Sequence, residues 1–419
     1  MMRYSQIAIA GITMLTLAGC AITPPLPPQK AGPAQPAIRP GDVREVKATP
    51  VSTTRAAQLV LAWPKGYTGG PIAYDSATGA RRFTLPPGRA DALGKLYFAA
   101  HAGTDTTDIK TYTLHDGVAI GSLTLSGAWE VSGISPNGLY VAATQVSTAD
   151  ERQAWIKQNA WKTRVQIIDA GQQQVKHTLN LDGNFEVETI SNDGHSLFLL
   201  ESLPAAKPDH YNVRQFDLWT ERMNEYPLRE KGNDEVMTGY AWDAVASYDG
   251  EWLMTLYLNS SKKEAFVHAL HLNYLLTVCI DLPSGDGNLD ALKEYRLTLS
   301  ADSKTLYAAN AALGVVTEVA LDAEISTYPP YQVVRTTHFT PSEIGIVNPS
   351  LFTHSVFSPD GKTLYFTSAN KAWAYDMRAH QVTRLPVEGA LFGITVSADG
   401  QRVYVNQENA LRTVDVLGH

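Results

Sequence analysis

A short phrase recurs six times in the last two-thirds of this 419-residue chain. In each copy a serine is followed two residues later by aspartate or asparagine, then by a turn residue and by an apolar pair that contains an aromatic residue. An Asp-Gly pair suits a tight turn, and the apolar pair suits a strand after it. A repeat of this kind predicts one small sheet used many times. The copies begin at Ser135, Ser191, Ser247, Ser300, Ser358 and Ser397, which are 39 to 58 residues apart.

The copy at Ser358 indicates what one unit contains. A short apolar segment precedes its turn, and three further segments rich in aromatic and β-branched residues follow, each bounded by turn residues. Four-stranded antiparallel units repeated in this way are the blades of a β-propeller, so we predict an all-β propeller. The strands of this unit are expected at 351–357, 363–368, 372–376 and 381–385.

The number of blades is harder to predict than the architecture. A degraded copy at 91–97 brings the six copies to seven, so we expect seven blades. Residues 59–85 have room for three further strands, which keeps eight blades as the alternative. The last unit stops near Val416 without a fourth strand. We expect a strand from the N-terminal region to complete it and to close the ring.

The N-terminus has the pattern of an export signal. Arg3 precedes an apolar run from Ile7 to Leu17, which is too short for a permanent membrane span. The run ends in Leu17-Ala18-Gly19-Cys20, which resembles the bacterial lipobox. The resemblance implies that 1–19 is a signal peptide and that Cys20 carries acyl chains such as palmitate. We therefore expect lipid anchoring on the extracytoplasmic side of a bacterial envelope membrane, with a non-lipidated export signal as the alternative.

Prolines punctuate the segment that follows. Eight of them lie between Cys20 and Thr54, with alanine and glycine among them, so this segment has little to bury. We expect residues 20–54 to form a disordered, extended tether. The propeller is then expected to span residues 55–419.

Composition excludes one class of partner. The chain has 34 Lys and Arg against 42 Asp and Glu, which gives a formal net charge of −8 at pH 7. A mildly acidic, evenly mixed chain is unsuited to nucleic acid. The sequence has no phosphate-binding loop, dinucleotide fingerprint, zinc-protease motif or haem-attachment motif. We therefore expect no cofactor, although the sequence does not exclude a metal in the central channel.

Two longer phrases resemble a known family. Residues 357–366 (FSPDGKTLYF) and 396–406 (VSADGQRVYVN) are similar to YVTN-type propeller repeats. The resemblance covers 58–416 and implies a fold found in bacterial surface and periplasmic proteins, related in pattern to the amine-dehydrogenase heavy chain and to bacterial lactonases. The copy at Ser300 departs from the pattern at Ser303, where glycine is usual. Because this architecture hosts many activities, the resemblance implies a fold and leaves the function open.

The first strand of each unit is expected to line the central channel. The residues there include acids, an arginine, a histidine and aromatic residues, a set suited to a small polar ligand. The acids and the histidine also suit a metal. A solvated channel without a ligand is the alternative. The candidate ligand-binding residues are Glu130, Glu188, Trp242, Arg296 and His354.

The longer and more variable loops form a second candidate surface, since loops on a rigid scaffold often carry function. Residues 148–161 favour a helix that contains Trp155 and Trp161, and His210 and Tyr211 lie on the next long loop. We take these four residues as candidates for binding a partner. The alternative is that both tryptophans pack down on the propeller.

Two functions agree with the sequence. The first is a lipid-anchored scaffold that binds an envelope protein or a small ligand through its loops. The second is a propeller hydrolase, similar to a lactonase, with a metal or polar site in the channel. The sequence lacks a nucleophile elbow and the other common catalytic motifs, which favours the scaffold.

Overall fold

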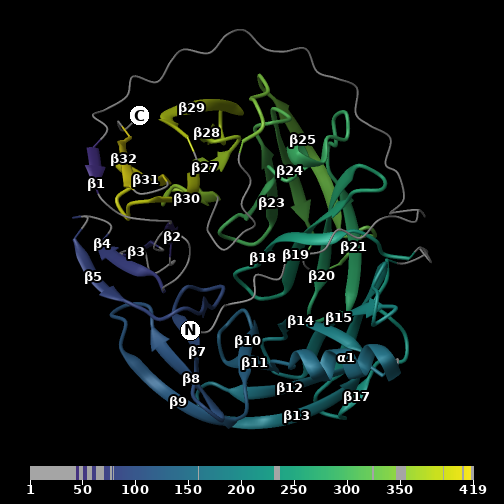
Figure 1. Ribbon diagram of the computed structural model, residues 1–419. Helices are drawn as coiled ribbons and strands as arrows, with labels where there is room; N and C mark the ends of the chain where they lie inside the picture. Colours follow the sequence, from purple (N-terminus) through teal and green to yellow (C-terminus); the bar gives the residue numbers. More distant parts are fainter. Residues whose placement is uncertain are drawn as a thin grey trace.

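The computed structural model is a ring of eight four-stranded antiparallel sheets (Figure 1). The all-β propeller is confirmed. The expected seven blades were one too few, and the alternative of eight is correct. The structure describes residues 44–46, 51–53, 59–62, 70–75, 78, 80–158, 160–230, 236–322, 325–345, 355–389, 391–407 and 410–416.

We number the blades 1 to 8 by the order of their first strands. In blades 1 to 4 the four strands follow one another along the chain and pair in that order. Blade 1 has β2 (Val51–Thr53), β3 (Leu59–Ala62), β4 (Ile72–Asp75) and β5 (Arg81–Thr84); blade 2 has β6 (Arg89–Ala90), β7 (Leu96–Ala102), β8 (Thr106–Thr113) and β9 (Ala119–Ser126). Blade 3 has β10 (Trp129–Ile134), β11 (Tyr140–Gln145), β12 (Lys162–Asp169) and β13 (Gln174–Asp182); blade 4 has β14 (Asn184–Ile190), β15 (Ser196–Leu203), β16 (His210–Asp217) and β17 (Arg222–Met223).

Blades 5 to 7 continue this order, and blade 8 takes its outer strand from the start of the chain. The helices are α1 (Ala149–Gln158) in blade 3 and the short α2 (Leu289–Leu292) before blade 6. Blade 5 has β18 (Tyr240–Ala246), β19 (Trp252–Asn259), β20 (Glu264–His271) and β21 (Leu276–Asp281); blade 6 has β22 (Arg296–Leu299), β23 (Thr305–Asn310), β24 (Val315–Leu321) and β25 (Tyr331–His338). Blade 7 has β26 (Ser355–Phe357), β27 (Thr363–Ser368), β28 (Lys371–Asp376) and β29 (Gln381–Glu388); blade 8 has β30 (Leu391–Val396), β31 (Arg402–Gln407), β32 (Ala410–Asp415) and β1 (Arg44–Val46).

An N-terminal strand closes the ring, as predicted. Strand β1 pairs antiparallel with β32, with Arg44 opposite Thr413 and Val46 opposite Leu411. This pairing covers the edge of β32 that would otherwise stay open. Both β1 and β2 lie within residues 20–54, the segment that the sequence assigned to the tether.

The core lies between blades rather than within them. Strand β19 shows the principle, because all of its residues are buried. Leu253 and Tyr257 on one side pack against blade 4, and Met254 and Leu256 on the other side join a cluster with blade 6. Blade 5 therefore buries both faces of this strand against its two neighbours, as a continuous apolar strand requires.

The recurring phrase is a hydrogen-bonded turn. In blade 7 the Ser358 hydroxyl donates to the Asp360 carboxylate at 2.7 Å and accepts from the Thr363 amide at 2.9 Å. The Asp360 carboxylate also accepts from the Lys362 amide at 3.1 Å. The degraded copy in blade 2 has no such serine. There the Asp91 carboxylate accepts from the backbone amides of residues 95 and 96. The turn therefore needs a short oxygen-bearing side chain, which explains why these residue types recur.

Neighbouring turns are also bonded to each other. The Asn137 amides of the backbone and side chain donate to Asn192, each at 2.9 Å, and the Asn192 side chain donates to the Asp249 carbonyl at 3.2 Å. The Ser303 hydroxyl accepts from the Tyr248 amide at 2.9 Å. Ser303 has a positive φ of 62°, a backbone region that favours glycine. Its hydroxyl makes the link to blade 5, which glycine could not do.

Removing one turn serine is expected to weaken the ring. Ser247 is fully buried, and its hydroxyl accepts from the Trp252 amide at 2.9 Å. Ser247→Ala leaves that buried amide without its partner, so we expect a loss of about 1–3 kcal/mol in the free energy of unfolding. Urea unfolding followed by tryptophan fluorescence measures it. Ser122→Ala, on an exposed position of β9, is the control and should change stability by less than about 0.5 kcal/mol. Equal effects of the two variants would contradict this role.

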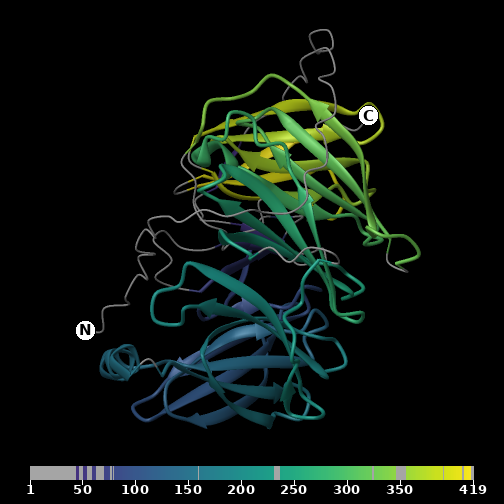
Figure 2. The ribbon, with the colours of Figure 1, turned by 90° about the vertical axis from the view of Figure 1, so that its right-hand side faces the viewer.

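The ring has two faces that differ in character. The turns between the first and second and between the third and fourth strands of each blade lie on one face, which we call the turn face. The loops between second and third strands, and the connections between blades, form the opposite loop face. Figure 2 shows α1 projecting from the loop face at the left and the hairpin of β24 and β25 projecting from the turn face at the right.

Candidate functional site

Four of the five candidate channel residues lie on the inner strands of four consecutive blades. These strands are nearest the centre of the ring (Figure 1). Glu130 is on β10, Glu188 on β14, Trp242 on β18 and Arg296 on β22. His354 lies outside the described residues. The four side chains meet different surroundings, so they do not form one constellation.

Glu188 lies at a bulge in β14, where the register shifts between Val187 and Thr189. Its Oε1 accepts from the Tyr257 hydroxyl at 3.4 Å, and its shielded Oε2 has no hydrogen-bond partner within the described part of the chain. Burial raises the pKa of Glu188 to about 7, against the opposing hydrogen bond from Tyr257, and the charge of Glu186 adds to the rise. This carboxyl group can therefore donate or accept a proton near neutral pH.

An aromatic stack lies behind Glu188, across the boundary between blades 4 and 5. The ring of Tyr257 stacks on Tyr211 with centroids 5.0 Å apart, and on Phe266 with centroids 5.5 Å apart. Tyr211 is only 6% exposed. The structure thus places Tyr211 in the interior, whereas the sequence suggested an exposed contact for a partner.

His268 completes this buried cluster. It is 1% exposed, and its ring lies edge-on to Tyr257 with the ring centroids 6.1 Å apart. Neither of its ring nitrogens has a hydrogen-bond partner among the described residues. Burial lowers the pKa of His268 to about 4, so the ring is neutral at physiological pH. His271 on the other side of β20 packs against Trp252, with ring centroids 4.5 Å apart. The two histidines share no ligand position.

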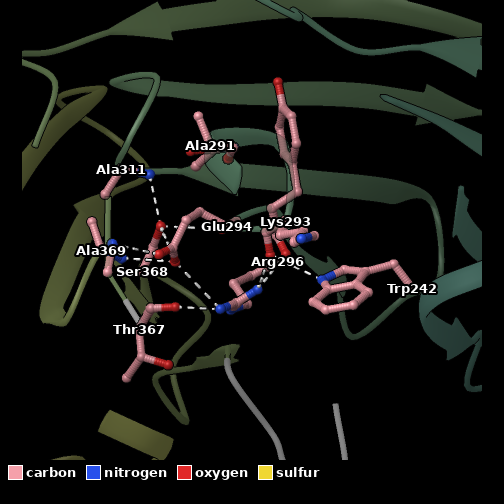
Figure 3. A network of polar contacts seen from close by, with 12 residues as sticks. Trp242, Ala291, Lys293, Glu294, Arg296, Ala311, Thr367, Ser368 and Ala369 are labelled. Atoms are coloured by element: carbon pink, nitrogen blue, oxygen red, sulfur yellow. Dashed lines mark hydrogen bonds and ion pairs between the residues drawn. The ribbon is translucent and has the colours of Figure 1, made fainter. Parts of the chain in front are cut away.

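Arg296 is held in a buried polar network (Figure 3). Its Nε donates to the Thr367 carbonyl at 3.0 Å, and its Nη1 donates to the Lys293 and Tyr295 carbonyls at 2.9 and 2.8 Å. Its Nη2 lies 3.4 Å from the Glu294 carboxylate. Burial lowers the pKa of Arg296, and the charge of Glu294 opposes that shift. Each nitrogen of the guanidinium group therefore has a partner within the protein, which leaves few donors for binding a ligand.

Glu294 is the centre of this network, and no sequence pattern pointed to it. Its Oε2 accepts from the Ala369 amide at 2.8 Å, and its Oε1 accepts from the Gly345 amide at 2.9 Å. The Ser368 hydroxyl donates to the Glu294 carbonyl at 3.1 Å. Glu294 and Arg296 together join blade 6 to blade 7, so the pair acts as a clamp between blades.

Trp242 lies beside this clamp. Its indole Nε1 donates to the Lys293 carbonyl at 2.9 Å, and the Lys293 ammonium lies 5.9 Å from the centroid of its ring. The ring of Tyr240 lies edge-on to the Trp242 indole, with the ring centroids 6.1 Å apart. Trp242 is half-buried and its polar atom is satisfied by the protein, as a packed indole requires.

The loop face carries the second set of candidates. Helix α1 begins with a capping box, in which the Thr148 hydroxyl accepts from the Glu151 amide and the Glu151 carboxylate accepts from the Thr148 amide. None of its residues is buried. Trp155 and Trp161 pack against each other with centroids 5.6 Å apart, and both stay half-buried. His210 contacts Asp209 on the neighbouring loop of blade 4. Three of the four predicted partner-binding residues are therefore accessible on this face.

The chemistry available to these residues is limited. Within the described ranges, no three His, Cys, Asp or Glu side chains gather as metal ligands would. A polar cluster around one buried acid, which the sequence did not reveal, lies between blades 6 and 7. There Glu318 contacts the Tyr375 hydroxyl and lies 3.7 Å from Arg335 and 3.4 Å from His380. Of the predicted channel residues, Glu188 stays the candidate site, together with its neighbour Glu186. These two carboxyl groups suit proton exchange or the binding of a polar ligand.

Within the described ranges, no helix combines the length and the apolar character that crossing a bilayer requires.

Comparison with known proteins supports the fold. No protein-family model matches the chain, and no curated protein matches it. The Dos1 propeller is similar in structure, with a TM-score of 0.50 and 8% identity over 90% of this chain and 94% of its own. Dihydro-heme d1 dehydrogenase NirN, solved in complex with DHE, has a TM-score of 0.50 and 12% identity over 86% and 70%. Kuenenia stuttgartiensis hydrazine synthase covers 86% of this chain and 99% of its own, with 15% identity and a TM-score of 0.46. The first two similarities and the eight sheets make this chain a β-propeller.

Proposed function

We propose that this chain is a YVTN-type propeller lipoprotein that serves as a binding scaffold in a bacterial envelope. The lipobox-like segment ending in Cys20 lies outside the described residues and supports the anchoring, with the extracytoplasmic location that it implies. The scaffold needs no cofactor. Its partner is an envelope protein that binds the loop face.

Helix α1 is the observation that carries this proposal. It is inserted between the second and third strands of blade 3, and it buries none of its residues in the ring. The helix has a capping box, and its Trp155 packs against Trp161 just beyond its end. Both rings are only partly buried, so they present accessible aromatic surface on the loop face. Tryptophan is enriched at the centres of protein interfaces, where it supplies much of the binding energy.

Site-specific photo-crosslinking in the native envelope tests the scaffold. A benzophenone amino acid at Gln153, on the exposed side of α1, is expected to capture one partner protein. The same probe at Gln174, on the exposed outer strand of blade 3, is the matched control and should capture none. Replacing Trp155 and Trp161 by alanine should abolish the Gln153 product. Equal cross-linking at both positions, or none at Gln153, would reject the loop face as the binding surface.

A hydrolase or small-ligand site in the channel is the second candidate. It is favoured by Glu188, whose shielded Oε2 lacks a partner among the described residues and whose pKa of about 7 suits a general acid or base. Metal analysis and mass spectrometry of the full chain, purified without chelator, should then find a stoichiometric metal or small molecule that Glu188→Gln releases. An empty channel would remove this candidate.

A further inference from the structure

The first strand of the ring shows where the N-terminal segment is attached. The turn between β30 and β31 lies on the turn face, so β32 also runs toward that face. Strand β1 is antiparallel to β32, with Arg44 near the end of β32 and Val46 near its start. The chain therefore enters β1 from the turn face. The 23 residues that link Cys20 to Arg44 are joined to the ring on this side.

The turn face also carries a row of exposed apolar side chains, one on each of five consecutive blades. Each lies in a turn, and Trp219 is the most exposed, with the ring of His195 edge-on to it at 5.5 Å. Single exposed apolar residues are normal on proteins, so these five matter because neighbouring blades present them from turns on the same face. We call this set the aromatic arc after its three aromatic members, and it consists of Trp219 (80% exposed), Tyr274 (62%) and Tyr328 (43%) with the aliphatic Val118 (53%) and Leu139 (50%).

We propose that the aromatic arc rests on the lipid surface in which Cys20 is anchored. This proposal depends on the lipid anchoring proposed above. Tryptophan and tyrosine are the side chains that prefer the boundary between lipid and water, because their rings are apolar and their tips are polar. The arc and the attachment point of the tether lie on the same face, so a bilayer is the surface that both can reach together.

The length of the tether makes a weak contact sufficient. Twenty-three residues in an extended conformation reach about 70 Å, so the lipid anchor holds the ring near the membrane. Docking is then intramolecular, and its effective concentration is high. The chain is acidic, with a net charge of −8, which disfavours attraction to anionic lipids. The aromatic side chains therefore supply the contact, and the loop face with α1 then points away from the membrane.

Quenching by brominated lipid tests this orientation. The lipidated full chain is reconstituted in vesicles of phosphatidylethanolamine and phosphatidylglycerol, with and without bromine on the acyl chains near the headgroups. We expect quenching of the tryptophan fluorescence, and we expect Trp219→Phe to lose most of it. Trp155→Phe, on the opposite face, is the matched control and should keep the quenching. Trp219 is 80% exposed and Trp155 is only partly buried, and each change keeps an aromatic ring, so both variants should keep the wild-type urea midpoint.

The outcomes separate docking from anchoring. The mass of the mature N-terminal peptide is measured first, and an unmodified Cys20 would reject the anchoring together with the docking that depends on it. With the lipid present, quenching that Trp219→Phe leaves unchanged would overturn the docking alone. Loss of quenching in Trp155→Phe would place the loop face on the bilayer and would also overturn it. Quenching that persists at high salt agrees with an aromatic contact, and its loss there would indicate an electrostatic one and contradict our argument.

Discussion

Glu294→Ala is expected to destabilise the ring by about 3–5 kcal/mol, the range for breaking a buried ion pair on one side. The variant leaves Arg296 buried without its carboxylate, and it leaves the Ala369 and Gly345 amides without their acceptor. Since these groups hold blade 6 against blade 7, the loss should appear in the global unfolding transition. Urea titration followed by circular dichroism measures the change.

Two further variants make this prediction specific. Asp182→Ala removes the exposed partner of Lys162 and should cost less than about 1 kcal/mol, because solvent screens that pair. Replacing Glu294 and Arg296 together by leucine and methionine should recover much of the loss, since no uncompensated charge is then buried. A cost for Glu294→Ala no larger than that for Asp182→Ala would show that the clamp contributes little.

Glu188→Gln is expected to stabilise the protein above neutral pH by about 2–3 kcal/mol and to have little effect at pH 4. The pKa of Glu188 in the folded chain, about 7, lies above its ordinary value of 4.5, so folding favours the protonated form. That stabilisation is complete below pH 4.5 and is lost as the pH rises through 7. Glutamine mimics the protonated carboxyl group and removes this dependence. Unfolding free energies at intervals from pH 4 to pH 8.5 test the prediction.

Glu130→Gln is the matched control for Glu188. Glu130 lies on the inner strand of the adjacent blade, but it is exposed, so its replacement should change stability by less than about 0.5 kcal/mol at each pH. A difference between wild type and Glu188→Gln that stays constant from pH 4 to pH 8.5 would exclude Glu188 as the group responsible.

The sequence predicted the fold where local hydrogen bonding demands particular residues. The serine and the aspartate two residues later can be recognised from sequence alone, because the turn at Ser358 uses both side chains. Blade 1 was missed because it lacks that turn, and because β1 and β2 lie in the segment that we read as tether. Three of its strands lie within 59–85, where the sequence left room for them, but no serine–aspartate turn marked the unit.

The candidate site was predicted less well, for a physical reason. Glu188 was placed correctly on an inner strand. The partners of Glu294, Gly345 and Ala369, lie more than 50 residues away in the chain, so no local sequence pattern identifies them. Tyr211 is different, because a signal existed. Alternation along β16 places Tyr211 inward beside Val213 and leaves His210 outward, as a strand with period two requires.

The closure of the ring by β1 links folding to the order of synthesis. Strand β1 is made near the beginning of the chain, and its partner β32 is made at the very end. Nearly the whole polypeptide must therefore be made before the two can pair, and contacts this distant in sequence form slowly. Until then the edges of β1 and β32 are open to wrong partners. A chain truncated anywhere before Ala410 cannot complete blade 8, so we expect proteases or chaperones to recognise unfinished chains through these unpaired edges.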